Sequence, residues 1–227
     1  MSGAWEILDH KRVLCAILCT DSTTMAWSLG FRNLQIPGQV IALQGMPFDM
    51  ARNQACVTCL QNGFDYLFFL DSDVVPPSDA VPRLLRHNLP IVSGVYYRRS
   101  PPLGLPVMMK KDSNGNFGWV TGFKVPDLLE VDVVGAGCLL IHRSVLERLP
   151  PQRPGYHWFD WRVNLKGLGI FPDTACLSED YCFNLHCAQY GIKTYVDTSV
   201  LCRHIGCAES HVNPGGQVEF IPARCVG

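Results

Sequence analysis

Residues 65–73 read Asp-Tyr-Leu-Phe-Phe-Leu-Asp-Ser-Asp, an apolar run that ends in two carboxylates one residue apart. Such a run of β-forming residues predicts a strand that is covered on both faces, as in a parallel sheet. In open α/β sheets, ligands bind at the carboxyl ends of the strands. The position of Asp71 and Asp73 therefore predicts a binding site at the end of this strand.

Two like charges this close repel each other unless a cation or hydrogen-bond donors compensate them. Mg2+ or Mn2+ supplies such compensation through oxygen ligands, and the ion can also bridge to a diphosphate. The alternative is an Asx-type turn ahead of a helix, because Pro76-Pro77-Ser78-Asp79 follows. We take a metal site at Asp71 and Asp73 as the hypothesis.

Length and composition predict one compact domain. The chain has 227 residues, 48% of them hydrophobic, and a net charge of -1, which argues against general attraction to nucleic acid or anionic lipid. Residues 1–12 lack the apolar core of a signal peptide, and no stretch reaches the roughly 18 apolar residues of a spanning helix. We therefore expect a cytoplasmic protein without a membrane anchor.

The eleven cysteines do not indicate a disulfide framework, because Cys15, Cys19 and Cys138 lie in apolar, strand-like runs. Cys56-Val57-Thr58-Cys59 is a lone CxxC within a helical pattern. Since no second pair stands at zinc-finger spacing, a structural zinc is only an alternative to burial in the core.

Strands and helices alternate through the first hundred residues. Ser22 and Asp49 are plausible helix caps, and Gly63 stands where a helix end favours glycine. The βαβαβαβ order predicts a mostly parallel sheet with right-handed crossovers. The expected strands are 13–19, 39–43, 66–70 and 91–97, and the expected helices are 22–33, 49–61 and 78–87.

The second half changes to an antiparallel pattern around the hairpin signal Asn114-Gly115. A helix is expected from about Arg143 and another over 178–190. The sequence thus predicts an α/β fold with a mostly parallel central sheet and a small antiparallel portion. The strands expected in this half are 107–111, 117–125, 129–134, 138–142, 193–197 and 200–204.

Five groups of residues, in this order, resemble GT-A fold glycosyltransferases of the family 2 type, in particular compact ones of phage and bacterial genomes. They are Ala51-Arg52-Asn53, Phe69 to Asp73, Gly135 to Ile141, Ser178-Glu179-Asp180, and His204. The resemblance covers roughly residues 12–206. It implies transfer of a sugar from a nucleotide sugar, expected to be a UDP-sugar, to an acceptor hydroxyl.

The resemblance also implies one GT-A domain over 1–227. Its nucleotide-binding half would be about 1–100, its acceptor and catalytic half 101–206, and its tail 207–227.

In the resembling enzymes the DxD aspartates hold a divalent metal that bridges the donor phosphates. Asp73 would be the direct ligand, Asp71 would face the ribose or a metal-bound water, and His204 would complete the coordination. The metal stabilises the charge of the departing diphosphate. Without the resemblance, a histidine after a strand is more often an ordinary surface or core residue.

The resemblance further places Thr20-Asp21 against the nucleotide base and Arg52-Asn53 beside the nucleotide, with Ser72 between the two aspartates. An arginine there can pair with a phosphate or with Asp71. The alternatives are an exposed helix residue for Arg52 and a carboxylate at a helix start for Asp21.

Gly135-Ala136-Gly137 would let the backbone approach the sugar, although a β-bulge uses the same residues. Trp158-Phe159, with Trp161, would cover the sugars, although aromatic pairs also pack in cores.

Glu179-Asp180 resemble the pair in which the second carboxylate acts as the base toward the acceptor hydroxyl. Direct displacement then inverts the anomeric carbon. The alternatives are acidic residues that stabilise a helix start, and a retaining reaction, since retaining enzymes share the fold.

Three other functions are alternatives to this interpretation. Leu70 to Val74 also resembles the nucleophile motif of haloacid dehalogenase type phosphatases, but there the motif follows the first strand. A sugar-nucleotide pyrophosphorylase would need a Gly-rich basic loop, which Cys19 to Ser22 lacks. An inactive, carbohydrate-binding relative is the alternative outside the enzymes.

The acceptor would be a glycan, a small molecule, a protein or a hydroxymethylated DNA base. Its expected groove combines Gly135 to Gly137, Trp158 and Phe159 with the basic residues Arg98, Arg99, Arg162 and Lys166.

Overall fold

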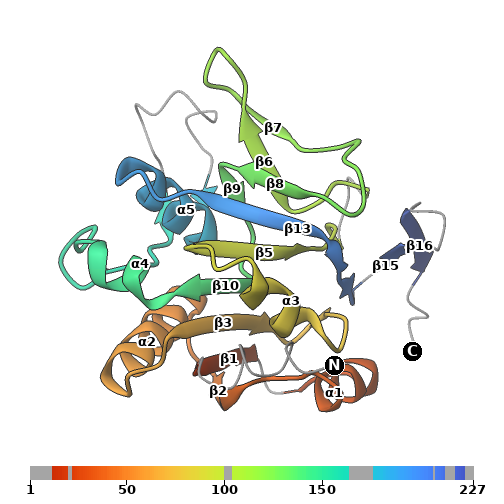
Figure 1. The fold of residues 1–227 in the computed structure, drawn as a ribbon, viewed down its shortest axis with the longest axis horizontal. Coiled ribbons are helices and arrows are strands. Elements are labelled where there is room, and N and C mark those ends of the chain that lie inside the picture. Colours follow the sequence, from red (N-terminus) through yellow and green to blue (C-terminus); the bar gives the residue numbers. More distant parts are fainter. Residues whose placement is uncertain are drawn as a thin grey trace, which may run out of the picture.

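The computed structural model describes residues 12–19, 22–99, 104–163, 176–206, 208–212 and 218–222. At its centre lies a seven-stranded sheet with the strand order β2-β1-β3-β10-β5-β13-β8 (Figure 1). These strands are β1 (Val13–Cys19), β2 (Gly38–Gln44), β3 (Tyr66–Asp71), β5 (Ile91–Val95), β8 (Leu128–Val131), β10 (Cys138–His142) and β13 (Thr194–Leu201).

The sheet is mostly parallel, as the sequence predicts. Strand β1 pairs in parallel with β2 and β3, and β5 pairs in parallel with β13. Strand β10 is antiparallel to both β3 and β5, and β8 is antiparallel to β13 at the edge. The protein therefore has a mixed α/β fold.

Helices cover both faces of the sheet because the central strands are apolar on both sides. In β3, Leu67 and Phe69 belong to one hydrophobic cluster, and Phe68 and Leu70 belong to the other. The first cluster includes residues of α2 (Phe48–Gln61), α4 (Arg143–Arg148) and α5 (Glu179–Gln189). The second includes residues of α1 (Met25–Arg32) and α3 (Ala80–Arg86).

The helix starts differ from the sequence prediction. The N-cap of α1 is Thr24 rather than Ser22, and its Oγ1 accepts a hydrogen bond from the Trp27 N–H at 3.1 Å. Helix α2 begins after Pro47, so Asp49 lies inside its first turn instead of capping it. Gly63 follows α2 with a φ of +66°, the left-handed conformation that glycine adopts without strain.

Three smaller sheets complete the described structure. Strands β6 (Met108–Lys111) and β7 (Phe117–Trp119) confirm the predicted hairpin and join β9 (Val133–Val134). Strand β4 (Val74–Val75) pairs with β14 (Arg203–His204), which leads to β15 (Ala208–Val212) and β16 (Val218–Pro222). Strands β11 (Arg162–Val163) and β12 (Cys176–Leu177) pair with each other.

Several boundaries in this half correct the prediction. Strand β7 ends at Trp119 rather than near residue 125. The segment expected as one strand over 129–134 is divided at Asp132, so that β8 joins the main sheet and β9 joins a small one. The range 207–227, which we expected to be a tail, contains the paired strands β15 and β16 in its described part.

The described cysteines pack as apolar residues. Cys15 and Cys138 are fully buried free thiols in the main sheet, and Cys56 and Cys59 are buried in α2. Burial raises the pKa of the Cys15 thiol to about 12, which keeps it neutral. Within the described ranges, the helices are too short or too polar to cross a membrane.

Candidate active site

The site lies where the carboxyl ends of β1, β3 and β5 meet the amino end of the antiparallel strand β10. Strand order reverses here, since the chain passes from β1 outward to β2 and then returns to β3. Ligands of open α/β sheets bind at such a point. A cleft of about 410 Å3 opens at this edge and is lined by Leu18, Phe48, Arg52, Asp71, Ser72, Asp73, Tyr96, Arg98, Arg99, Val107, Trp161, Ser178, Glu179, Asp180 and His204.

The backbone of the Asp71-Ser72-Asp73 turn is tied to its neighbours. The Trp27 indole Nε1–H donates to the Asp71 carbonyl oxygen at 2.9 Å. The Ser72 N–H donates to the Leu18 carbonyl oxygen at 3.2 Å, and the Asp71 N–H donates to the Gly137 carbonyl oxygen at 3.2 Å. These contacts fix the direction in which the two carboxylates leave the strand.

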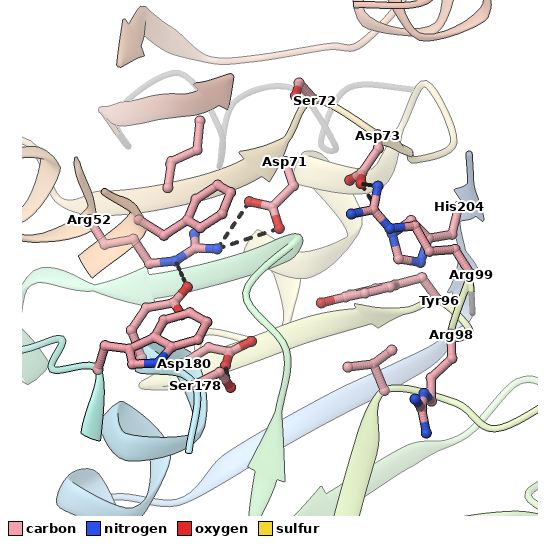
Figure 2. A pocket seen from close by; sticks show the side chains of 15 residues that line it. Arg52, Asp71, Ser72, Asp73, Tyr96, Arg98, Arg99, Ser178, Asp180 and His204 are labelled. Atoms are coloured by element: carbon pink, nitrogen blue, oxygen red, sulfur yellow. Dashed lines mark hydrogen bonds and ion pairs between the residues drawn. The ribbon is translucent and has the colours of Figure 1, made fainter. Parts of the chain in front are cut away.

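Arg52 lies buried between two carboxylates at the back of the cleft. Its Nε donates to Glu179 Oε1 at 2.9 Å, and its Nη2 donates to Asp71 Oδ1 at 3.0 Å (Figure 2). Burial by itself lowers the pKa of Arg52, but the charges of Asp71 and Glu179 raise it overall, so the guanidinium stays charged. The alternative of an exposed helix residue is thereby excluded, since only 2% of Arg52 is exposed.

Asn53 does not face the cleft, which corrects the expectation that it lies beside the nucleotide. Its Oδ1 accepts hydrogen bonds from the Trp158 and Phe159 N–H groups at 3.0 and 3.2 Å, and its Nδ2 donates to the Phe159 carbonyl oxygen at 2.7 Å. These bonds use the amide to hold another chain segment. Asn53 is therefore a structural residue in this fold.

Trp158 and Phe159 are likewise core residues rather than a cover for the sugars. Trp158 is 5% exposed and donates from Nε1 to the Leu146 carbonyl oxygen, while Phe159 is fully buried and stacks on Phe183 with ring centroids 4.4 Å apart. Of the three aromatic residues expected to cover the sugars, Trp161 is the one that lines the cleft, and it is 44% exposed. Core packing, the alternative interpretation, thus explains the Trp158-Phe159 pair.

Asp73 and His204 come together because β14 pairs with β4, which sets His204 opposite Val74. The Nε2 of His204 lies 3.5 Å from Asp73 Oδ2. Arg99 forms an ion pair with the same oxygen through Nη1 (Figure 2). Burial alone would raise the pKa of Asp73, but the contacts with His204 and Arg99 hold it below its usual value.

The His204 ring has one orientation that suits metal binding. Its Nδ1 lies 2.6 Å from the Tyr97 carbonyl oxygen, and a carbonyl only accepts, so Nδ1 carries the proton. In metal sites a ligating histidine usually donates its other N–H to such a partner. In the neutral ring the lone pair of Nε2 therefore faces the Asp73 carboxylate. A cation bound between the two groups would relieve the repulsion between this lone pair and the carboxylate oxygen.

The described residues contain no group of three or more His, Cys, Asp or Glu side chains arranged to hold a metal. Asp71 is occupied by Arg52, which leaves the two ligands Asp73 and His204. Mg2+ commonly binds through one or two carboxylates and takes the remaining ligands from water and substrate phosphates. Asp73 and His204 could therefore hold a divalent ion only if water and a bound phosphate supplied the other ligands.

The acidic pair at the start of α5 is divided between two environments. Glu179 is 4% exposed, and burial together with the neighbouring Asp180 raises the pKa of Glu179 despite the contact with Arg52. Asp180 is partly exposed to the cleft and accepts hydrogen bonds from the Ala136 N–H at 3.3 Å and from the Ser178 hydroxyl. Of the two carboxylates, Asp180 is the one that a substrate could reach.

Tyr96 is a cleft residue that sequence reasoning missed, and its position explains Gly135 and Gly137. A methyl group on Gly135 would lie 2.1 Å from the Tyr96 hydroxyl oxygen, and one on Gly137 would lie 3.1 Å from it. The Gly137 N–H donates to this oxygen at 3.0 Å. The two glycines therefore make room for a tyrosine, which corrects the expectation that they make room for a sugar.

The Tyr96 hydroxyl is directed toward the space between Asp71 and Asp180 (Figure 2). Burial, reinforced by these two charges, raises the pKa of Tyr96 well above its usual value, so the hydroxyl stays protonated. Titratable groups with perturbed pKa values in a cleft are typical of functional sites.

The remaining expected residues are only partly covered. Thr20, Asp21 and Lys166 lie outside the described residues, and for Arg162 only the backbone in β11 is described. Arg98 lines the cleft with its guanidinium 5.6 Å from the centroid of the Trp119 ring. Ser72 also lines the cleft.

Comparison with known proteins supports the fold alone. No protein-family model matches the sequence, and no curated protein matches it. Among solved structures, the chain is similar to the crystal structure of A197 from STIV, with a TM-score of 0.62 and 20% sequence identity. The similarity covers 95% of this chain and 97% of that chain, so it extends over the whole α/β domain.

Proposed function

We propose that this protein is a GT-A fold glycosyltransferase that moves a sugar from a nucleotide sugar, in the first instance a UDP-sugar, to an acceptor hydroxyl. One observation carries the proposal. A single cleft joins Asp73 and His204 on one wall to Asp180 on the other, at the edge of the sheet where ligands bind. Inverting transfer from a diphosphate needs these two functions, charge stabilisation and a base, on opposite sides of the reacting carbon.

The leaving diphosphate would lie on the wall of Asp73. Asp73 and His204 would hold Mn2+ or Mg2+, which acts as a Lewis acid toward the phosphates when bound. Arg52 adds a permanent positive charge and holds Asp71 in place. Ser72 and Asp71 would contact the nucleotide from the same turn.

The acceptor would lie on the wall of Asp180. Its hydroxyl would give a proton to the Asp180 carboxylate while its oxygen attacks the anomeric carbon, and the bond to the diphosphate breaks on the other face. This direct displacement inverts the anomeric carbon. Glu179 is a positioning residue in this scheme, because it is buried and reaches the site through Arg52.

Two alternatives are less well supported. In a haloacid dehalogenase type phosphatase the first aspartate would attack phosphorus, but Asp71 is engaged by Arg52 and follows the third strand of the chain. A carbohydrate-binding relative would not need a reachable carboxylate opposite a metal site. Hydrolysis of a nucleotide-sugar donor, screened across donors with Mn2+, separates an enzyme from a binding protein.

The proposal is tested by calorimetry of UDP binding with and without Mn2+. We expect Asp73→Ala to abolish the Mn2+-supported part of the binding while the fold stays intact, because the metal loses its protein anchor. Asp79→Ala is the matched control, since Asp79 also pairs with an arginine but lies outside the cleft lining. Equal UDP affinities in the wild type and Asp73→Ala would refute metal-dependent donor binding.

The acceptor proposals remain a glycan, a small molecule, a protein or a hydroxymethylated DNA base. A DNA acceptor would need several cations for its phosphates, so its transfer rate would fall steeply with salt. Transfer to hydroxymethylated DNA and to simple glycosides at low and moderate salt distinguishes these classes.

A further inference from the structure

Arg99 occupies the position that the proposed metal would need. Its Nη1 pairs with Asp73 Oδ2, the same oxygen that faces His204 Nε2 at 3.5 Å. A guanidinium and a divalent cation would compete for this oxygen, because two positive groups held side by side repel each other. We therefore expect a metal that binds between Asp73 and His204 through this oxygen to displace Arg99.

Packing against Gly206 defines the position of the Arg99 side chain beside Asp73. Gly206 follows β14, and a methyl group there would lie 2.7 Å from Arg99 Cδ and 2.8 Å from Arg99 Cβ. The aliphatic part of Arg99 thus lies against a backbone that has no side chain. The guanidinium of the neighbouring Arg98 lies over the Trp119 ring, so the two adjacent arginines contact different residues.

Arg99 can also leave at little cost. Its side chain is 53% exposed, and that of Asp73 is 26% exposed. Exposed ion pairs contribute little to stability. A guanidinium can form two parallel hydrogen bonds to a phosphate, just as it can to a carboxylate. Once a metal has bound Asp73, the diphosphate of a bound donor would be a better partner for Arg99 than any remaining side chain of the cleft lining.

We propose that Arg99 is a diphosphate-binding residue that rests on Asp73 while the cleft is empty and moves to the donor phosphates when the metal binds. This inference rests on the proposed function. It implies that free divalent ions bind weakly, because they must displace Arg99 without offering it a partner. The ion and the nucleotide diphosphate bind well together, because the diphosphate supplies that partner.

The test measures Mn2+ binding by electron paramagnetic resonance, without UDP, and UDP binding by calorimetry at saturating Mn2+. Arg99→Met should strengthen free Mn2+ binding about fivefold, the size expected for removing one exposed competing ion pair. The same variant should weaken UDP binding about tenfold, because a charge-assisted phosphate contact is lost. Opposite changes in the two affinities are the signature of an exchange of partners.

Two further variants make the result specific. Gly206→Ala keeps the charge but displaces the stem of Arg99, so it should strengthen free Mn2+ binding as Arg99→Met does. Arg143→Met is the matched control and should leave free Mn2+ binding unchanged, since Arg143 also pairs with a carboxylate, that of Glu147, but lies outside the cleft lining.

The exchange is overturned if Arg99→Met leaves free Mn2+ affinity unchanged or lowers it. The proposed function survives that outcome when Asp73→Ala still abolishes Mn2+-supported UDP binding. If neither the wild type nor any variant binds Mn2+, with or without UDP, both the exchange and the metal-dependent function are refuted.

Discussion

The two aspartates of one motif meet two very different arginines. Asp71 pairs with Arg52, whose side chain is 3% exposed, whereas Asp73 pairs with Arg99, whose side chain is 53% exposed. A buried guanidinium that loses its partner is left as an uncompensated charge, but an exposed one is rehydrated by water. Burial of the cation thus decides whether an ion pair is a permanent part of the site or an exchangeable contact.

The surroundings of the two pairs agree with this difference. Arg52 also binds Glu179 and lies 5.0 Å from the centroid of the Phe69 ring, so the core defines its position. Its Nη1 is buried with no hydrogen-bond partner among the described residues. Arg99 lines the cleft, is largely exposed, and contacts Gly206 and the carboxylate of Asp73. We call the first group the fixed wall (Arg52, Asp71, Glu179, Asp180) and the second the exchange wall (Asp73, Arg99, His204).

The largest expected effect tests whether the fixed wall carries the chemistry. Asp180→Asn should lower the transfer rate about 100- to 10,000-fold, the usual range for removing a positioned base. Donor affinity should stay near that of the wild type, because the exchange wall is untouched. Turnover and UDP affinity are measured on the same preparation. A transfer rate close to the wild-type value would reduce Asp180 to a residue that stabilises the start of α5.

The next prediction compares the two arginines directly. Arg52→Met should cost about 3–5 kcal/mol of unfolding free energy, because Asp71 and Glu179 lose the charge that compensates them in a buried place. Arg99→Met should cost less than about 1 kcal/mol, the value of an exposed pair. Both are measured by urea unfolding of matched samples. Similar costs for the two variants would contradict the division into a fixed wall and an exchange wall.

The sequence predicts the frame of this site better than its lining. Apolar runs predict β1 and β10 with the bounds that the structure shows. A strand that is buried on both faces has apolar side chains at consecutive positions, so its ends are visible in the sequence. The insertion of β10 between β3 and β5 could not be predicted, since it depends on pairing between distant segments. That insertion brings Gly135 to Gly137 beside the cleft.

The misassigned residues have side chains that serve equally well in a core and in a binding site. Asn53 and Trp158 became structural because each finds its hydrogen-bond partners in a distant segment of the chain. Tyr96 was missed because it continues an apolar, strand-like run. The available signal was the pair of glycines two residues apart, whose missing side chains mark a close neighbour without identifying it.

A smaller effect than that of Arg52→Met is expected at Gly137, which packs against Tyr96 beside the fixed wall. Gly137→Ala should cost about 1–3 kcal/mol of unfolding free energy, as overpacking in a core does. The added methyl would lie 2.8 Å from Val74 Cγ2 and 3.1 Å from the Tyr96 ring carbon Cζ, and both neighbours are buried. Gly118→Ala in β7 is the control, because a methyl there meets nothing within 4 Å. The control should change stability by less than about 0.5 kcal/mol.

Both glycine variants are measured by thermal and urea unfolding, together with Gly137→Ala in a Tyr96→Phe background. Removing the hydroxyl takes away one of the crowded atoms, 3.1 Å from the added methyl, and should recover part of the lost stability. If Gly137→Ala lowers the unfolding free energy no more than Gly118→Ala does, the residues around Tyr96 can shift to accommodate a methyl group. The position of the fixed wall would then depend on the Arg52 ion pairs and not on packing around Tyr96.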